Sequence, residues 1–166
     1  MSFVELLLVA VGLSMDAFAV SVCKGLSVKK LGVKHALIAG AYFGGFQFLM
    51  PVIGWFLGSR FEHIITSFDH WIAFGLLAII GVNMIQESFS KAEELNDDFG
   101  VKTMLMMAVA TSIDALAVGI SMAFLKVSIY LPSFIIGFTT FILSLAGVCF
   151  GYRFGKIKGI IIPLLK

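Results

Sequence analysis

The sequence has 166 residues, of which 60% are hydrophobic and 13% charged, and its mean hydropathy is +1.04. Ordinary soluble domains carry about 25% charged residues, so this composition excludes that class and indicates an integral membrane protein. The formal net charge of +2 is small, and the lysines are spread over short loops, which argues against a nucleic-acid-binding surface.

Five apolar stretches are long enough to cross a bilayer as helices, because a span needs roughly 20 apolar residues. We expect these helices at about residues 4–23, 36–57, 70–87, 103–125 and 131–152. Short polar segments connect them. The longest connection, residues 91–102, is acidic and predicts a solvated loop near the middle of the chain. Pro51 removes a backbone hydrogen bond inside the second helix and predicts a kink there.

Basic residues are distributed unequally between the two sides of this predicted bundle. Ten Lys and Arg residues fall after the first, third and fifth helices, whereas only Arg60 and Lys126 fall on the opposite side. Cytoplasmic loops carry the excess of basic residues in membrane proteins. We therefore expect a multi-pass membrane protein with its N-terminus outside and the loop 91–102 in the cytoplasm.

Two stretches of the chain repeat each other. VGLSMDAFAVSVCKG contains Asp16, and the similar VATSIDALAVGISMA contains Asp114, 98 residues later. GWFLGSRF at the end of the second helix likewise matches GVCFGYRF at the end of the fifth, at a spacing of 93 residues. A repeat unit of three helices places its second copy in the opposite orientation, which predicts an inverted-topology repeat with a binding site near the membrane midplane.

The repeat divides the chain into three parts. We expect a first three-helix repeat at residues 1–90, the acidic loop at 91–102, and a second repeat at 103–166 that contains only its first two helices. The partner of the third helix would begin near residue 163, so GIIIPLLK reads as a helix cut at its start. This leaves one flank of the second repeat uncovered. We therefore expect lower stability than that of a six-helix protein, and either an inactive chain or a homodimer in which a second copy covers the flank.

The motifs GLSMDAFAVS, HWIAF and ATSIDALAVG, in this order, resemble those of the MntP family of bacterial manganese efflux pumps. The resemblance covers residues 1–154. It implies a six-helix inner-membrane transporter, not an enzyme, that exports Mn²⁺ as its substrate and uses no cofactor. The chain departs from the family in offering five complete helices, and in carrying Gln47 where some members have an acidic residue.

The residues themselves point to a cation site at the repeat interface. Two carboxylates, Asp16 and Asp114, would repel each other at a two-fold axis unless a cation or a proton lay between them. A hard divalent ion such as Mn²⁺ prefers oxygen ligands. The candidates for neutral oxygen ligands, or for residues along the ion path, are Ser14, Gln47, Asn83, Thr111, Ser112 and Thr140.

These neutral candidates are not equivalent. Gln47 and Thr140 occupy corresponding positions of the second and fifth helices, which favours them. Ser14 and Ser112 precede their aspartates by two residues and so project about 200° away, which means that they contribute only where the helix unwinds. Serine and threonine in membrane helices also commonly form hydrogen bonds between helices, which is an alternative role for all of them.

Other functions remain open at this point. The aspartates would be purely structural if each paired with a lysine or held helices together. An exporter of another cation such as Cd²⁺, or of a small amino acid, fits the same paired repeats. An intramembrane aspartyl protease also uses two membrane aspartates, but neither a YD nor a GxGD motif surrounds Asp16 or Asp114.

Overall fold

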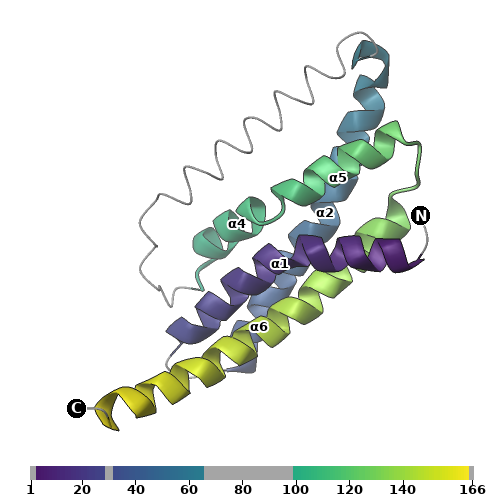
Figure 1. The fold of residues 1–166 in the computed structure, drawn as a ribbon. Coiled ribbons are helices and arrows are strands. Elements are labelled where there is room, and N and C mark those ends of the chain that lie inside the picture. Colours follow the sequence, from purple (N-terminus) through teal and green to yellow (C-terminus); the bar gives the residue numbers. More distant parts are fainter. Residues whose placement is uncertain (1–2, 29–31, 66–98, 165–166) are drawn as a thin grey trace.

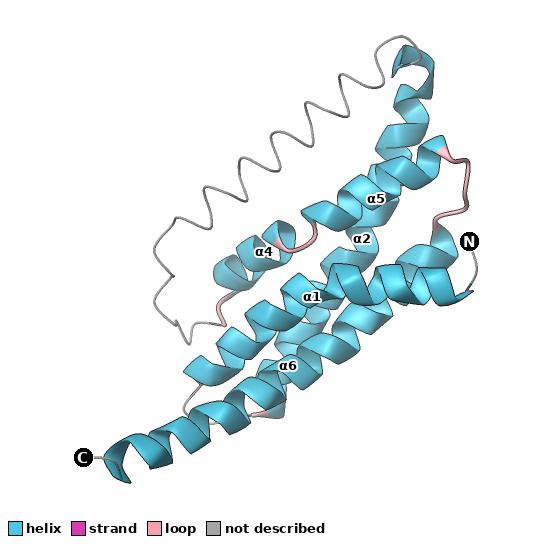
Figure 2. Ribbon diagram, viewed as in Figure 1, coloured by secondary structure: helices cyan, strands magenta, loops and turns pink. Residues whose placement is uncertain are grey.

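The computed structural model describes residues 3–28, 32–65 and 99–164. Within these ranges every regular element is an α-helix (Figure 2). The helices are α1 (Phe3–Ser27), α2 (Val33–Ile65), α4 (Val101–Ala110), α5 (Ile113–Phe124) and α6 (Tyr130–Leu164). The prediction of an all-α, polytopic helical membrane protein is confirmed. The helix expected at 70–87, the candidate Asn83 and most of the acidic loop lie outside the described residues.

Three of the described helices are long and apolar enough to cross a membrane. They comprise residues Phe3–Ser27, Val33–Arg60 and Tyr130–Lys156, and the bent pair formed by α4 and α5 would make a fourth span. Glu5 in the first turn of α1 and Lys24 in its last turn complement the helix dipole. The predicted helices at 4–23, 36–57 and 131–152 therefore exist, and each is longer than the sequence indicated.

Helix α6 differs most from the prediction at its C-terminal end. It has 35 residues, which correspond to a length of about 50 Å and exceed the hydrocarbon core of a bilayer. The GIIIPLLK stretch up to Leu164 continues α6, so its interpretation as the start of a separate helix is wrong. The reason is local: glycine alone does not end a helix, and Pro163 comes too late to stop this one.

The predicted helix at 103–125 is also wrong in one respect, because the structure divides it into α4 and α5. The two segments meet at Thr111 and Ser112 with a bend of 45°. Both hydroxyls donate back to carbonyl oxygens of α4, which is how Ser and Thr compete with the helical hydrogen-bond pattern. The break is visible between the labels α4 and α5 in Figure 1.

The helices pack in crossed pairs. Helix α1 lies along α6, and α2 packs against both α6 and α5, whereas α1 and α2 barely touch (Figure 1). A cluster of small and apolar side chains from α1, α2, α4 and α6 forms the centre of the bundle. Its buried members are Ala17, Ala36, Ala39, Phe43, Met104, Ala108 and Val148.

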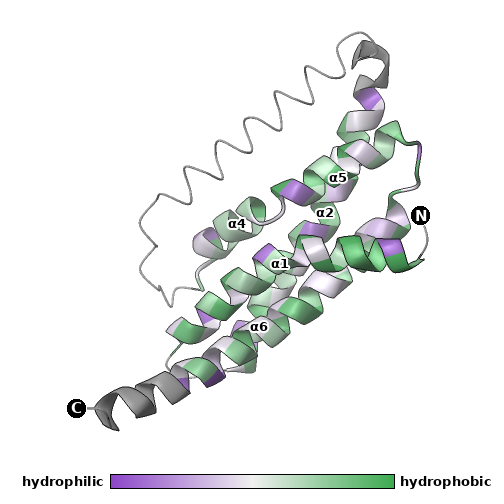
Figure 3. Ribbon diagram, in the orientation of Figure 1, coloured by the Kyte–Doolittle hydropathy of each residue, from purple (hydrophilic) through white to green (hydrophobic). Residues whose placement is uncertain are grey.

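The distribution of side chains is that of a membrane protein. Alanine and serine are frequent among the buried residues, whereas large apolar side chains such as Phe56, Phe134 and Phe150 are more than half exposed. Small residues let membrane helices approach closely, and the large apolar ones suit contact with lipid. Short hydrophilic stretches interrupt the apolar ribbons of α1, α2 and α5 (Figure 3).

Candidate transport site

The two repeated aspartates are on different helices of the bundle. Asp16 lies in the middle of α1 and is exposed with respect to the described residues, and Asp114 is half-buried in the first turn of α5. The carboxylates are close enough for the charge of Asp16 to act on Asp114. The pair that the sequence repeat singled out therefore lies within one region of the bundle.

The break between α4 and α5 determines the setting of Asp114. Its Oδ1 atom accepts a hydrogen bond of 2.7 Å from the backbone N–H of Ala115. That N–H belongs to the first turn of α5, where backbone donors lack helical partners and the helix dipole favours a negative charge. Ser112, the N-cap of α5, makes no capping hydrogen bond with its side chain. Asp114 thus takes over part of the capping of its own helix.

Thr111 and Ser112 direct their hydroxyls at the end of α4. Thr111 Oγ1 donates to Met107 O at 3.0 Å, and Ser112 Oγ donates to Ala108 O at 2.6 Å. Both side chains are buried. The last carbonyls of α4 form the negative end of a helix dipole, which favours a nearby cation. In many transporters, the exposed carbonyls at a break in a membrane helix coordinate an ion.

A second polar cluster lies where α1 and α6 meet. The hydroxyls of Ser14 and Thr140 are 2.7 Å apart, and both side chains are completely buried. Ser14 Oγ also lies 2.6 Å from Ala10 O, and Thr140 Oγ1 lies 2.9 Å from Ile136 O. The two hydroxyl groups have only two protons between them for these three hydrogen-bond contacts. The cluster therefore has more acceptors than donors.

Gln47 extends this cluster from α2. Its Nε2 atom donates to Leu13 O of α1 at 2.6 Å, and the side chain is completely buried. Gln47 Oε1 has no hydrogen-bond partner among the described residues. Ser14, Gln47 and Thr140, which come from three helices, are therefore brought together around the middle of α1.

The predicted residues come from two parts of the fold. Asp114, Thr111 and Ser112 lie at the helix break, while Ser14, Gln47 and Thr140 lie between α1, α2 and α6. Helix α1 stays continuous through Ser14, which is buried, while Asp16 is exposed on another side of the same helix. On helical geometry, local unwinding of the helix is a condition for either serine to contribute. Of the two positions, only Ser112 lies at such a break.

The structure also contains buried hydroxyls that sequence reasoning missed. Ser21 of α1 and Ser133 and Ser144 of α6 are buried, and their hydroxyls have no hydrogen-bond partner among the described residues. A signal was available, because Ser14 and Ser21 are seven residues apart, as are Ser133 and Thr140. That spacing places side chains on one helix face.

Acidic, histidine and cysteine ligands are sparse. No group of three His, Cys, Asp or Glu side chains that could hold a metal ion occurs in the described parts of the chain. A cation bound there would need neutral oxygens beside the two carboxylates. This requirement is typical of a hard ion such as Mn²⁺ and not of a zinc site with clustered His or Cys.

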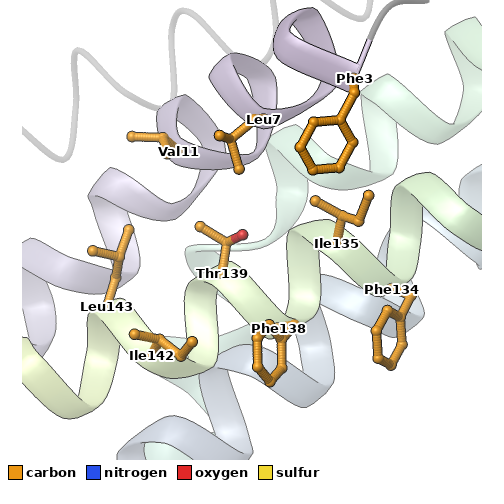
Figure 4. A pocket seen from close by; sticks show the side chains of 9 residues that line it. All are labelled: Phe3, Leu7, Val11, Phe134, Ile135, Phe138, Thr139, Ile142 and Leu143. Carbon is orange, nitrogen blue, oxygen red and sulfur yellow. The ribbon is translucent and has the colours of Figure 1, made fainter.

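A pocket between the first halves of α1 and α6 is of a different kind. It has a volume of about 380 Å³, and Figure 4 shows its lining residues. Eight of the nine are apolar, including Leu7, Val11 and Phe138, and the one polar side chain is Thr139. With no charged group in its lining, this pocket does not provide the ligands that a divalent cation needs.

Comparison with known proteins agrees on one family. The family model described as "Putative manganese efflux pump" matches residues 30–162. Relatives called "Putative manganese efflux pump MntP" include one from Acetivibrio thermocellus, 55% identical over 93% of this chain and 79% of its own length. Another from Desulfitobacterium hafniense is 56% identical over 94% of this chain and 83% of its own length. No solved structure matches the chain significantly. The chain belongs to the MntP family.

Proposed function

We propose that this chain exports Mn²⁺ across the bacterial inner membrane, through a site at the interface of two inverted repeats. Asp16 and Asp114 carry the proposal, because they recur at matching positions of the repeats and because Asp114 lies within reach of the charge of Asp16. The curated relatives are named as manganese efflux pumps, and this chain covers about four fifths of their length. Manganese is the substrate in this proposal.

The helix contacts support the inverted repeat. Gly54 of α2 lies so close to α5 that an added Cβ would meet the backbone of Leu116. Gly147 of α6, 93 residues after Gly54, likewise lies close to the backbone of Phe18 in α1. Leu116 follows Phe18 by 98 residues, which is the spacing of the two aspartates. The contact between α2 and α5 thus corresponds to the contact between α6 and α1.

A second pair of contacts obeys the same relation. A Cβ added to Gly58 would meet the backbone of Ile120, and one added to Gly151 would meet the backbone of Val22. The two glycines are again 93 residues apart, and Val22 and Ile120 are again 98 residues apart. A two-fold axis in the membrane plane would exchange these contacts and would bring the aspartates of α1 and α5 to equivalent positions.

The chemistry follows from charge and ligand type. Two carboxylates balance the charge of one divalent ion, and the neutral oxygens around them complete its coordination without adding charge. Candidates for these oxygens are Ser14, Gln47, Asn83, Thr111, Ser112 and Thr140. An ion held by balanced charge can be released on the other side, which a pump requires.

Orientation and assembly belong to the same proposal. The excess of basic residues after α1 and in and after the C-terminal part of α6 supports an external N-terminus and a cytoplasmic loop at 91–102. The division into repeats at 1–90 and 103–166 follows from the same spacing of motifs. The homodimer stays a prediction, for which the mass of the detergent-solubilised protein is the test.

Transport by purified protein tests the function directly. The chain would be reconstituted into liposomes with a manganese-sensitive dye inside, and uptake of Mn²⁺ would be compared with that of empty liposomes. We expect protein-dependent uptake that Asp16→Asn abolishes. Liposomes in which wild-type protein and Asp16→Asn behave like empty ones would contradict the proposal. Faster movement of Cd²⁺ than of Mn²⁺ would replace manganese with another cation.

A further inference from the structure

We propose that Gln47 sets the ion specificity of the pump by presenting its amide carbonyl oxygen to the transported divalent cation. The inference rests on the proposed function and adds a specificity-determining residue to it. Gln47 lies in the middle of α2, is completely buried, and bridges to the backbone of α1. Its amide is polar at both ends, but only one end is engaged within the described residues.

The orientation of the amide is determined by its partner. Leu13 O is a carbonyl oxygen and can only accept a hydrogen bond, so the atom 2.6 Å away must be the NH₂ group of Gln47. The oxygen Oε1 is therefore the end that has no partner among the described residues. Because Nε2 is anchored to a helix backbone, Oε1 points in a fixed direction, as a preorganised ligand requires.

The unpartnered oxygen differs from the other unpartnered atoms in the bundle. Within the described residues these are the hydroxyls of Ser21, Ser133 and Ser144 together with Gln47 Oε1. A hydroxyl rotates and can donate to a carbonyl of its own helix, as Ser14 does to Ala10. An amide carbonyl only accepts, so its burial is relieved only by a donor or by a cation.

The position of the amide is close to that of Asp16 along α1. Leu13 and Asp16 are three residues apart in α1, so they lie on the same face of the helix, about one turn apart. The Gln47 amide, which binds Leu13 O, therefore lies within about one turn of Asp16 along α1. Beside it, the hydroxyls of Ser14 and Thr140 form the cluster that has more acceptors than donors. A cation suits such surroundings better than a further acceptor does.

An amide oxygen at this place has a chemical consequence. It is a hard, neutral ligand, so it favours Mn²⁺ over softer ions without adding to the two negative charges of the aspartates. A third carboxylate would hold the ion more tightly and slow its release, and a thioether would favour Cd²⁺. Specificity and turnover should therefore both depend on the side chain at position 47.

Three variants separate these roles. Gln47→Leu removes the oxygen, Gln47→Met replaces it with sulfur, and Gln47→Glu replaces the amide with a carboxylate of the same shape. We expect Gln47→Leu to raise the KM for Mn²⁺ by at least about tenfold, the loss of one moderate interaction. Gln47→Met should shift the ratio of Cd²⁺ to Mn²⁺ transport toward Cd²⁺. Gln47→Glu should lower both KM and kcat.

The matched control is Ser133→Ala, which also removes a buried unpartnered polar atom, two turns from Thr140 in α6. Uptake by this variant in the liposome assay should equal that of the wild type. Binding of Mn²⁺ to detergent-solubilised protein, measured by electron paramagnetic resonance, provides a readout that does not depend on transport. Gln47→Leu should weaken this binding, while its thermal unfolding temperature stays the same or rises.

The outcomes distinguish the two proposals. If the wild-type protein transports Mn²⁺ and Gln47→Leu has the same KM, selectivity and binding, the role of Gln47 is overturned. The proposed function would then still stand. Wild-type protein that neither binds nor moves Mn²⁺ would overturn the proposed function and this inference with it. Reduced transport with unaltered selectivity and binding would show that Gln47 only anchors α2 to α1, which also overturns the inference.

Discussion

Gly44 of α2 and Gly137 of α6 pack against each other's backbone in a reciprocal manner. A Cβ added to Gly44 would lie 2.9 Å from Gly137 O, and a Cβ added to Gly137 would lie 2.9 Å from Gly44 O. The next contacts correspond as well, since Gly44 approaches Phe141 and Gly137 approaches Phe48. Both pairs are separated by 93 residues, so this crossing of α2 and α6 lies where the axis between the repeats would pass.

This reciprocity makes a prediction about stability. Gly44→Val and Gly137→Val should destabilise the protein by similar amounts, about 1–3 kcal/mol each, because each pushes the same two backbones apart. The double variant should lose less stability than the sum of the two single losses, because the first substitution has already separated the helices. Thermal unfolding in detergent measures these differences.

The neighbouring Gly45 provides the control for this pair. A Cβ added there meets no atom within 4 Å. Gly45→Ala should therefore leave stability unchanged or raise it by about 0.5–1 kcal/mol, through the lower entropy cost of alanine in a helix. Very different effects of Gly44→Val and Gly137→Val would argue against a two-fold relation at this crossing.

Labelling of single cysteines tests the orientation in the membrane. Cys23 and Cys149 are exposed in the structure and would first be replaced by alanine. In that background, Ser128→Cys in the loop between α5 and α6 should react with an impermeant thiol reagent added outside intact cells. Val33, at the start of α2, is 77% exposed in the wild-type structure. The variant Val33→Cys should react only after the cells are opened.

The reversed labelling pattern would place the N-terminus in the cytoplasm. It would contradict the interpretation of the basic residues and, with it, the direction of export. Reaction of both cysteines from outside would mean that one of the expected spans between positions 33 and 128 does not cross the membrane. If neither cysteine reacts before the cells are opened, the loop after α5 is not on the outer surface, which also contradicts the prediction.

Much of the fold was predictable because apolar length is a strong signal. The helices α1, α2 and α6 follow from uninterrupted apolar runs, and a bilayer leaves little choice but a helix for such a run. Their ends were less predictable. Residues 155–164 of α6 combine glycines and lysines with apolar residues and contain no strong stop signal before Pro163, so the helix continues past the membrane-spanning part.

The site was predictable in its residues but not in its arrangement. Repetition identified Asp16 and Asp114, yet the matching motifs adopt different backbones, continuous at Ser14 and broken at Ser112. A single hydroxyl is not enough to break the helix, since Ser14 also bonds back to its own helix while α1 continues. The residue before it differs, because the first motif has Leu13 where the second has Thr111. Two adjacent hydroxyls, rather than one, distinguish the broken copy.

The paired hydroxyls at the break make the next prediction. Thr111→Val combined with Ser112→Ala removes all side-chain hydrogen bonds from these two residues to the carbonyls of α4 and introduces residues that permit a continuous helix. We expect stability to stay within about 1 kcal/mol of the wild type, because the lost hydrogen bonds are replaced by helical ones. Manganese transport should fall, because Asp114 would lose its place at a helix start.

Ser121→Ala is the control for this variant. Ser121 also donates to a carbonyl of its own helix, Ala117 O at 3.0 Å, but it is exposed and lies inside the unbroken part of α5. Its replacement should change neither transport nor stability appreciably. Full transport by the Thr111→Val, Ser112→Ala double variant would show that the break is not needed for function.

The last prediction concerns the pair of aspartates. Asp16→Asn and Asp114→Asn should each abolish manganese transport, because one remaining carboxylate cannot balance a divalent ion in a bilayer. Asn at position 114 keeps an oxygen that can accept the Ala115 N–H, so the start of α5 should survive. The double variant should be no worse than either single one, because two ligands of one ion act as a unit. Uptake into liposomes measures activity, and thermal unfolding shows whether each variant still folds. Near-normal transport by either single variant would assign that aspartate a structural role, and the shared site would then have to be abandoned.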